Sequence, residues 1–277
     1  MSSNTDINIK KLQSTANIIR QDIIRMLAKA GSGHAGGSLG MTDILTVLYF
    51  KILKHTAEQP NNRYRDRLVL SNGHICPVLY ATLARAGYFP LVKLKSLRQI
   101  NSDLQGHPHK SSLPGIETSS GPLGQGISQA VGMALAANMN KQKHHIFCIT
   151  SDGEHDEGQV WEAIMTAHKY KLDNLINIID YNGIQIDGLT KDIMPLNSLR
   201  QKYEAFHWQV LEMNGHNIKE IIKTLEKAKN IKKPVAIIAH TILGKGVSFM
   251  ENQYAWHGKA PNEEEKTKAL KELEDAK

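Results

Sequence analysis

The strongest constraint on the fold is a pair of apolar, β-branched runs joined by a segment with helical spacing. The runs are Ile146–Ile149 and Leu175–Ile179, and the helical segment between them is Gln159–Tyr170. A strand, a helix and a second strand in this order form a βαβ unit. Its two strands pair in parallel because the helix carries the chain back to the starting end of the sheet. The centre of the chain is therefore predicted to form a parallel sheet covered by helices.

The same alternation extends to both sides of this unit. Further helices are expected over residues 9–29, 42–53, 74–86, 196–206, 218–229 and 262–277, and further strands over 68–70, 208–213 and 235–241. Thr42 is expected to cap its helix, whereas the glycine-rich stretch 31–40 and the stretch 103–121 are expected to be loops. The pattern predicts an α/β protein with three α/β/α layers around a mainly parallel sheet, built by residues 1–277 as a single domain.

Composition and charge narrow the class of protein. The chain has 277 residues, of which 41% are hydrophobic and 22% charged, as is ordinary for a soluble globular protein. Cys76 and Cys148 lie in apolar surroundings without metal-site spacing, so they are expected to be buried free thiols. The sequence shows no targeting pattern and no apolar run of membrane-spanning length, so we expect a cytoplasmic location and no membrane partner. The net charge of +7 comes from dispersed lysines without a nucleic-acid motif, so a solvated basic surface is preferred to a nucleic-acid site. A modest positive field would also suit phosphorylated sugars.

Polar residues follow both central strands. Asp152 and Gly153 come shortly after the first strand, and Asn182 follows the second, 30 positions after Asp152. The carboxyl ends of parallel strands meet at one edge of a sheet, where open α/β sheets bind ligands. A carboxylate, an amide oxygen and a main-chain carbonyl, that of Ile184, are hard oxygen ligands suited to Mg²⁺ or Ca²⁺, and Gly153 would let a diphosphate approach the backbone. Each triplet alone is also a common turn sequence, and only the pair at βαβ spacing favours a metal site.

Four of the 13 histidines stand in glycine-rich or irregular stretches, namely His34, His74, His107 and His257. A single loop histidine is usually a surface or hydrogen-bonded residue, but four beside a candidate metal and diphosphate site weaken that interpretation. Imidazoles hydrogen-bond sugar hydroxyls and move protons near neutral pH. His74 is expected at a helix N-terminus, where the positive end of the helix dipole keeps an imidazole neutral.

Seven short motifs run in order from residue 31 to residue 258. They read G-S-G-H-A-G-G-S-L-G, S-N-G-H, G-H-P, E-T-S-S-G-P-L-G-Q-G-I-S-Q-A-V-G-M-A, S-D-G-E-H-D-E-G-Q-V-W-E-A, D-Y-N-G-I-Q-I-D-G and W-H-G. Together they resemble the amino-terminal, diphosphate-binding part of transketolase, and the run from Gly121 to Met133 is the most specific. The S-D-G triplet followed by Asn182 also resembles the thiamine-diphosphate motif, which usually has glycine in place of Ser151.

The resemblance implies a thiamine diphosphate enzyme with bound Mg²⁺ or Ca²⁺. The metal would be held by Asp152, Asn182 and the carbonyl of Ile184. Contacts to the cofactor would come from His74, Gly121, Pro122, Leu123, Gly153, Asn182 and His257. The catalytic residues facing the sugar would be His34, His107 and His257. Glu157, grouped with the cofactor-binding residues, matches the acidic residue that joins a carboxylate network between subunits in the family.

In transketolases the cofactor lies between two domains from different subunits. The second domain supplies the glutamate that hydrogen-bonds the aminopyrimidine ring and most of the arginines that grip the substrate phosphate. This sequence ends shortly after W-H-G, so it is expected to be one subunit of a split transketolase. Its partner would carry the pyrimidine-binding and C-terminal domains, and the assembly would contain two copies of each chain, with the small-residue helix after Gly121 at an interface.

The expected reaction is transfer of a two-carbon ketol unit from a ketose phosphate to an aldose phosphate. Three alternatives stay open. The chain could belong to a transketolase-like enzyme that acts on an unusual sugar, or to a 2-oxo acid dehydrogenase. It could also be a non-catalytic subunit that only binds the cofactor.

Overall fold

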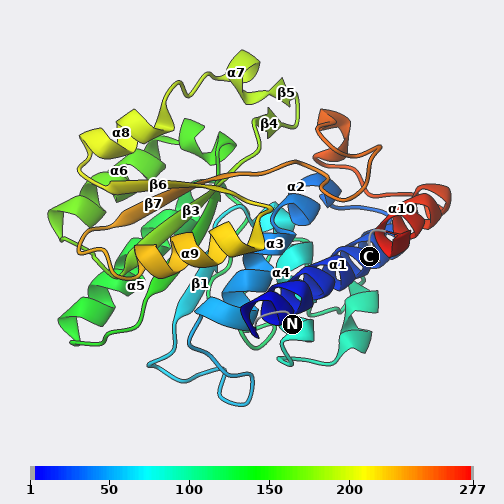
Figure 1. The fold of residues 1–277 in the computed structure, drawn as a ribbon, viewed down its shortest axis with the longest axis horizontal. Coiled ribbons are helices and arrows are strands. Elements are labelled where there is room, and N and C mark those ends of the chain that lie inside the picture. The colour runs from blue at the N-terminus through cyan, green and yellow to red at the C-terminus, as the bar shows by residue number, and fades with distance from the viewer. Residues whose placement is uncertain (1–3, 276–277) are drawn as a thin grey trace.

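The central element is a five-stranded sheet, seen in a computed structural model that describes residues 4–275 (Figure 1). In spatial order the strands are β1 (Arg67–Leu70), β2 (Ile146–Ser151), β3 (Leu175–Tyr181), β7 (Val235–His240) and β6 (Gln209–Asn214). Every adjacent pair in this sheet is parallel. All residues of β2 are buried, as expected of a parallel strand covered on both faces. The predicted βαβ unit and parallel sheet are confirmed.

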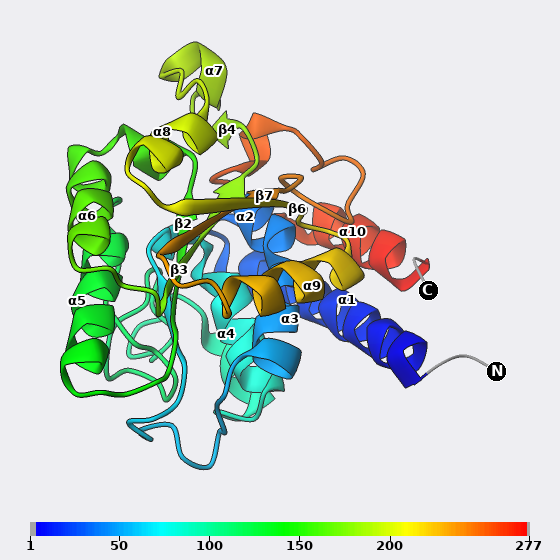
Figure 2. The same cartoon turned by 60° about the vertical axis from the view of Figure 1, so that its left-hand side comes forward.

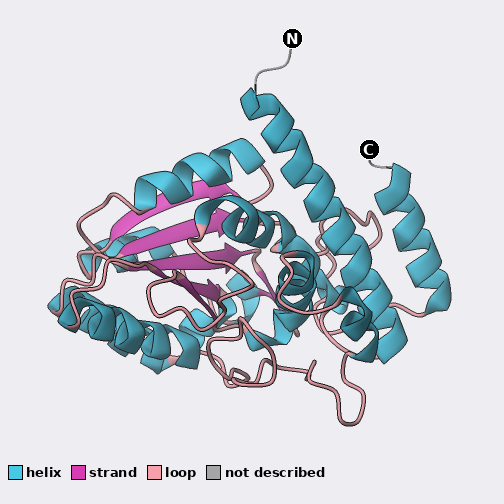
Figure 3. Ribbon diagram, turned by 90° about the horizontal axis from the view of Figure 1, so that it is seen from below, coloured by secondary structure: helices cyan, strands magenta, loops and turns pink. Residues whose placement is uncertain are grey.

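Helices cover both faces of the sheet and make three layers (Figures 2 and 3). One face carries α5 (Gln125–Met139), α6 (Gly158–Lys169) and α8 (Leu199–Ala205), and the other carries α1 (Asn4–Ala30), α3 (Thr42–Val47), α4 (Cys76–Arg85) and α9 (Ile218–Ala228). The helix α10 (Glu263–Asp275) packs along α1 (Figure 1). The predicted α/β/α class is confirmed. Within residues 4–275, no helix combines the length and the apolar character needed to cross a bilayer.

Alternation along each strand explains why two hydrophobic clusters form. In β3, Ile178 belongs to the cluster shared with α1, α3 and α4, whereas Ile179 belongs to the cluster shared with α5 and α6. Successive side chains of a strand point to opposite faces, so one apolar strand contributes to both cores. Cys76 lies in the first cluster and Cys148 in the second, and both are free and buried, as predicted.

The glycine-rich stretch 31–40 is not a loop throughout, which corrects the sequence-based prediction. Residues Ala35–Gly40 form the short helix α2, and all of them are buried. Glycine has a low helix propensity, but the close packing of α2 leaves no room for a larger residue at two of its positions. A Cβ atom on Gly36 would lie 2.5 Å from the Leu243 side chain, and one on Gly37 would lie 2.7 Å from Ile75. Close tertiary packing therefore outweighs local helix propensity.

Two further details differ from the predictions. Thr42 is not the cap of α3, because Met41 occupies that position and the Thr42 hydroxyl donates to the carbonyl oxygen of Ser38 at 2.8 Å. After β3 the chain forms a hairpin that was not predicted, made of β4 (Ile184–Gln185) and β5 (Gly188–Leu189), followed by α7 (Thr190–Ile193). Strands of two residues are too short to show an alternating pattern.

Candidate functional site

A cavity of about 350 Å³ lies at the carboxyl ends of β2 and β3. Most of the residues singled out in the sequence line it, namely His34, His74, His107, Gly121, Leu123, Asp152, Gly153, Asn182, Ile184 and His257. Pro122 and Glu157 are exposed and are not among the lining residues, so their expected contacts to a cofactor stay predictions. The parallel sheet thus gathers side chains from separate stretches of the chain at one edge.

Hydrogen bonds between β2 and β3 hold two carboxylates in the cavity wall. The main-chain N–H of Asp152 donates to the carbonyl oxygen of Asp180 at 3.1 Å. The Asp152 carboxylate accepts main-chain hydrogen bonds from Gly153 at 2.8 Å and from Gly183 at 2.7 Å. Asn182 follows Asp180 by two positions and lines the same cavity. Two buried acids and an amide therefore share one small volume.

The electrostatics of this corner fit a divalent cation. Burial, followed by the charge of nearby Asp180, raises the pKa of Asp152 to about 7, and burial raises the pKa of Asp180 to about 6. No cationic side chain within residues 4–275 is among the causes that lower either pKa. A bound cation would favour both ionised forms. The amide oxygen of Asn182, which accepts a hydrogen bond from the main-chain N–H of Ile184 at 2.9 Å, and the main-chain oxygen of Ile184 are further hard oxygen donors among the residues that line the cavity. The chemistry of these residues therefore fits Mg²⁺ or Ca²⁺, which they would hold together with Asp152.

Three imidazole rings pack together in the cavity wall. The ring centroid of His34 lies 4.9 Å from that of His74 and 5.7 Å from that of His257, and His74 and His257 are 5.4 Å apart. Within the described residues, the Nδ1 atoms of His34 and His257 are buried and have no hydrogen-bond partner. Buried polar atoms are normally paired, so these two nitrogens fit a ligand that supplies the missing partners.

Burial keeps these rings neutral near physiological pH. It is the largest cause that lowers the pKa of His34 to about 4 and that of His74 to about 3, and it also lowers the pKa of His257. The lowered pKa agrees with the expected neutrality of His74, and burial is its largest cause. A neutral imidazole offers one donor and one acceptor nitrogen, so it can hydrogen-bond a hydroxyl and exchange a proton with it.

We expect the His34 ring to stay neutral when the ligand-free chain is taken from about pH 8 to about pH 5.5, because its folded-state pKa of about 4 lies below the ordinary value near 6.5. The NMR signals of its ring protons, assigned with a His34→Asn variant, should keep their chemical shifts over this range. A short histidine-containing peptide, titrating near its ordinary pKa, is the control. A midpoint for His34 equal to that of the peptide would contradict the expectation.

The comparisons with known proteins agree with this geometry. The family model described as transketolase, thiamine diphosphate binding domain, matches residues 11–274. The chain belongs to the transketolase family. One relative, a 6-deoxy-6-sulfo-D-fructose transketolase subunit from Clostridium sp., is 46% identical over 95% of this chain and 96% of its own length. Another, one of the subunits of an apulose-4-phosphate transketolase from Phocaeicola vulgatus, is 42% identical over 96% of this chain and 94% of its own length.

Full-length transketolases match over only part of their length. The transketolase of Homo sapiens is 38% identical, and the match covers 91% of this chain but 40% of the human protein. The crystal structure of transketolase from Campylobacter jejuni superposes with a TM-score of 0.91 at 39% identity, covering 96% of this chain and 43% of that one. The resemblance seen in the sequence and the fold class are thus confirmed, and the chain corresponds to the diphosphate-binding portion of a transketolase.

Glu154 is a buried residue of this transketolase domain that sequence reasoning did not single out. Its carboxylate accepts hydrogen bonds from the Ser71 hydroxyl at 2.6 Å and from the main-chain N–H groups of Gly124 at 2.8 Å and Ser151 at 3.0 Å. It therefore ties the ends of β1 and β2 to the turn that follows Gly121–Leu123. The S-D-G-E motif contains this acid, but nothing in the sequence distinguishes it from a solvated one.

Arg98 was also missed, and it joins the two loops that carry His34 and His107. Its guanidinium lies 3.5 Å from the Ser32 hydroxyl and 3.4 Å from the carbonyl oxygen of Gly106. Its charge contributes to the lowered pKa of both histidines, after burial as the largest cause. The backbone of Arg98 has a φ of 58°, which side-chain-bearing residues seldom adopt, so its position was not predictable from local propensity.

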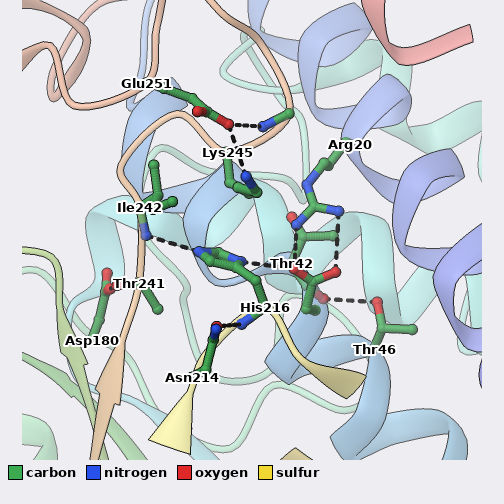
Figure 4. A network of polar contacts seen from close by, with 12 residues as sticks. Arg20, Thr42, Thr46, Asp180, Asn214, His216, Thr241, Ile242, Lys245 and Glu251 are labelled. Atoms are coloured by element: carbon green, nitrogen blue, oxygen red, sulfur yellow. Dashed lines mark hydrogen bonds and ion pairs between the residues drawn. The ribbon is translucent and has the colours of Figure 1, made fainter. Parts of the chain in front are cut away.

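A buried polar network positions the segment after β7 (Figure 4). Arg20 of α1 pairs with Asp43 of α3 at 2.6 Å, and Nδ1 of His216 donates to Asp43 at 2.9 Å. The other ring nitrogen of His216 accepts from the main-chain N–H of Ile242 at 2.8 Å. Because Ile242 must be the donor, the proton of the His216 ring is on Nδ1. The network therefore anchors Ile242 to the helical layer.

The anchored segment contacts two parts of the cavity wall. The Thr241 hydroxyl donates to the carboxylate of Asp180 (Figure 4). The main-chain N–H of Gly244 donates to the carbonyl oxygen of Gly36 at 2.9 Å, in the helix that begins directly after His34. Contacts thus run from α1 and α3 through this segment to Asp180 and to the short helix that follows His34.

Proposed function

We propose that this chain, as a single diphosphate-binding domain, is one subunit of a split transketolase that transfers a two-carbon ketol unit from a ketose to an aldose. The observation that carries the proposal is the convergence of three packed, neutral histidines with the buried acids Asp152 and Asp180 in one cavity. Sugar hydroxyls and a metal-bound diphosphate need these two kinds of group side by side.

The chain's own residues would bind and orient the reactants. Asp152, Asn182 and the carbonyl of Ile184 would hold Mg²⁺ or Ca²⁺, with His74, Gly153 and the main chain of Gly121–Leu123 against the cofactor. Thiamine diphosphate, when bound, supplies the nucleophilic carbon and the electron sink for breaking and remaking a carbon–carbon bond beside a carbonyl.

The histidines would bind the sugar hydroxyls and exchange protons with them. The unpaired Nδ1 atoms of His34 and His257 lie buried in the cavity wall, where they can donate to or accept from sugar hydroxyls and stabilise developing oxyanion charge. His107 is exposed at the same cavity and would contact the sugar from its rim. Neutral rings suit this role, because one nitrogen can take a hydroxyl proton and later return it.

The partner would be a protein carrying the pyrimidine-binding and C-terminal domains, in an assembly with two copies of each chain. This proposal is supported by two relatives of nearly the same length whose names describe them as transketolase subunits. Exposed Glu157, beside the start of α6, would meet the partner or a second copy in a carboxylate network.

The donor sugar divides the proposal into two candidates. Pentose phosphates are the substrates expected from the family resemblance. The two relatives at 46% and 42% identity are named for 6-deoxy-6-sulfo-D-fructose and apulose 4-phosphate, which favours a less common ketose with a phosphate or sulfonate end group. A 2-oxo acid substrate is less well supported, because the histidine-lined cavity offers several groups for hydroxyls.

The decisive assay measures two-carbon transfer with Mg²⁺ and thiamine diphosphate, for this chain alone and mixed with its candidate partner. Xylulose 5-phosphate, 6-deoxy-6-sulfofructose and apulose 4-phosphate would be tested as donors, with ribose 5-phosphate and glyceraldehyde 3-phosphate as acceptors. We expect turnover only in the mixture. Turnover by the chain alone would show that no partner is needed. Cofactor binding without turnover of any donor would support the non-catalytic alternative.

A further inference from the structure

A second cavity, of about 510 Å³, opens near the amino-terminal ends of β1 and β2. Arg67, the first residue of β1, and His144, two residues before β2, are in its wall. The histidine-lined cavity lies at the opposite ends of these strands. Since β2 has six residues at about 3.3 Å each, roughly 20 Å of strand separates the two. The second cavity is therefore not an extension of the proposed transketolase site.

The wall of this cavity carries an excess of positive charge. Four of its side chains are cationic, namely Arg63, Arg65, Arg67 and Lys110, and its one acid is Glu117. Glu117 is buried and already pairs with both Arg65 and Arg67, the latter at 2.9 Å. Within residues 4–275, Arg63 and Lys110 form no ion pair and are exposed at the rim. The cations are thus only partly neutralised by the protein itself.

His144 supplies an independent sign of a missing ligand. Its side chain lies in the same wall, the residue is only 7% exposed, and its Nδ1 atom is buried with no hydrogen-bond partner among the described residues. Burial, followed by the charge of Arg67, lowers its pKa, so the ring is neutral and can donate one N–H. A neutral imidazole with an unpaired buried nitrogen, beside two cations that form no ion pair within the described residues, suits an oxyanion that would supply the missing partner.

We propose that this cavity binds the phosphate group of a small phosphorylated molecule. Arg63, Arg67 and Lys110 would neutralise the anion, and His144 would donate a hydrogen bond to it. The volume lies within the range of small-molecule sites, and the cations line a hollow rather than a flat or extended stripe, which favours a small molecule over a nucleic acid.

The test is a titration of the ¹⁵N-labelled chain with inorganic phosphate, followed by NMR. Shifts of the amide signals of residues lining the second cavity would give its affinity, while signals from His34 and His74 would report separately on the first cavity. An Arg63→Gln/Lys110→Gln variant changes only exposed side chains. It should weaken phosphate binding at the second cavity at least about tenfold, because two charge-assisted contacts are lost.

A Lys223→Gln/Lys227→Gln variant is the matched control. It removes the same charge from exposed positions of α9 and should leave the affinity unchanged. If both variants weakened phosphate binding equally, the effect would come from net charge alone and the proposal would be wrong. It would also be wrong if neither variant changed the phosphate affinity. If a short oligonucleotide bound more tightly than inorganic phosphate, and the Arg63→Gln/Lys110→Gln variant lost this binding, the ligand of the cavity would be a nucleic acid and not a small molecule.

His144 is tested by a pair of substitutions in the same titration. His144→Gln keeps an N–H donor and should retain most of the phosphate affinity, whereas His144→Leu should lower the phosphate affinity several-fold. Thermal unfolding of both variants would check that the buried position tolerates the change. Equal affinities in two folded variants would exclude His144 from the site.

Discussion

Replacing Asp152 with alanine is expected to abolish Mg²⁺-dependent binding of thiamine diphosphate to this chain. The substitution removes the one ionised ligand of the proposed metal set and leaves only neutral oxygens from Asn182 and Ile184. Loss of a residue that merely orients a metal ligand costs about 10- to 100-fold in affinity, so loss of a direct ligand should exceed about 100-fold. Wild-type thermal stability should rise with cofactor and Mg²⁺, and that of the variant should not, because ligands stabilise only the state they bind.

The apoprotein of this variant should remain folded. Burial and the nearby Asp180 already disfavour the charged form of Asp152. Removing the carboxylate therefore relieves this cost, although it also loses the hydrogen bonds that the carboxylate accepts from Gly153, Gly183 and Thr190. Asp173→Ala is the matched control, since it deletes a carboxylate near the start of β3, at the opposite end of the strand from the cavity. If cofactor and Mg²⁺ raised the thermal stability of the Asp152→Ala variant as much as that of the wild type, Asp152 would not be a ligand of the metal.

The second large effect is expected for Gly244→Ala, which should destabilise the fold by about 3 kcal/mol or more. Gly244 has a φ of +78°, which an alanine adopts only with strain, and its Cβ atom would lie 2.5 Å from the carbonyl oxygen of Met250 and 2.6 Å from its carbonyl carbon. Backbone atoms cannot move aside as a flexible side chain can. Urea unfolding, followed by circular dichroism, would measure the loss as a lower midpoint concentration.

Gly31→Ala separates the two causes of this loss. Gly31 has a similar φ of +65° after the end of α1, but a Cβ atom there would have no heavy atom within 4 Å other than those of Gly31 and its two chain neighbours. Alanine there should cost only the strain of the left-handed conformation, about 1 kcal/mol. Equal losses at both positions would show that the contact with Met250 contributes nothing. A much larger loss at Gly244 would show that the segment after β7 is held tightly against its neighbours.

Most of the fold was predictable because its strands carry a pattern that only a covered parallel sheet satisfies. Ile146–Ile149 and Leu175–Ile179 are almost entirely apolar, and the helical segment between them has the length of one crossover. Asp152 and Asn182 were predicted to meet for the same reason, since strand order places both at one edge. Local patterns failed where packing decided, as in α2, whose glycines are required by contacts with Ile75 and Leu243.

The parallel sheet, the residue types at its carboxyl edge and the likeness to transketolases could be predicted from the sequence, because they depend on order and spacing along the chain. The folded structure was needed to show which polar groups are buried and which of them have no hydrogen-bond partner. Asp180 and Glu154 look like ordinary acids in the sequence, and the Nδ1 atom of His144 lacks a partner only in the folded chain. Burial arises from contacts between distant segments, and no pattern of neighbouring residues encodes it.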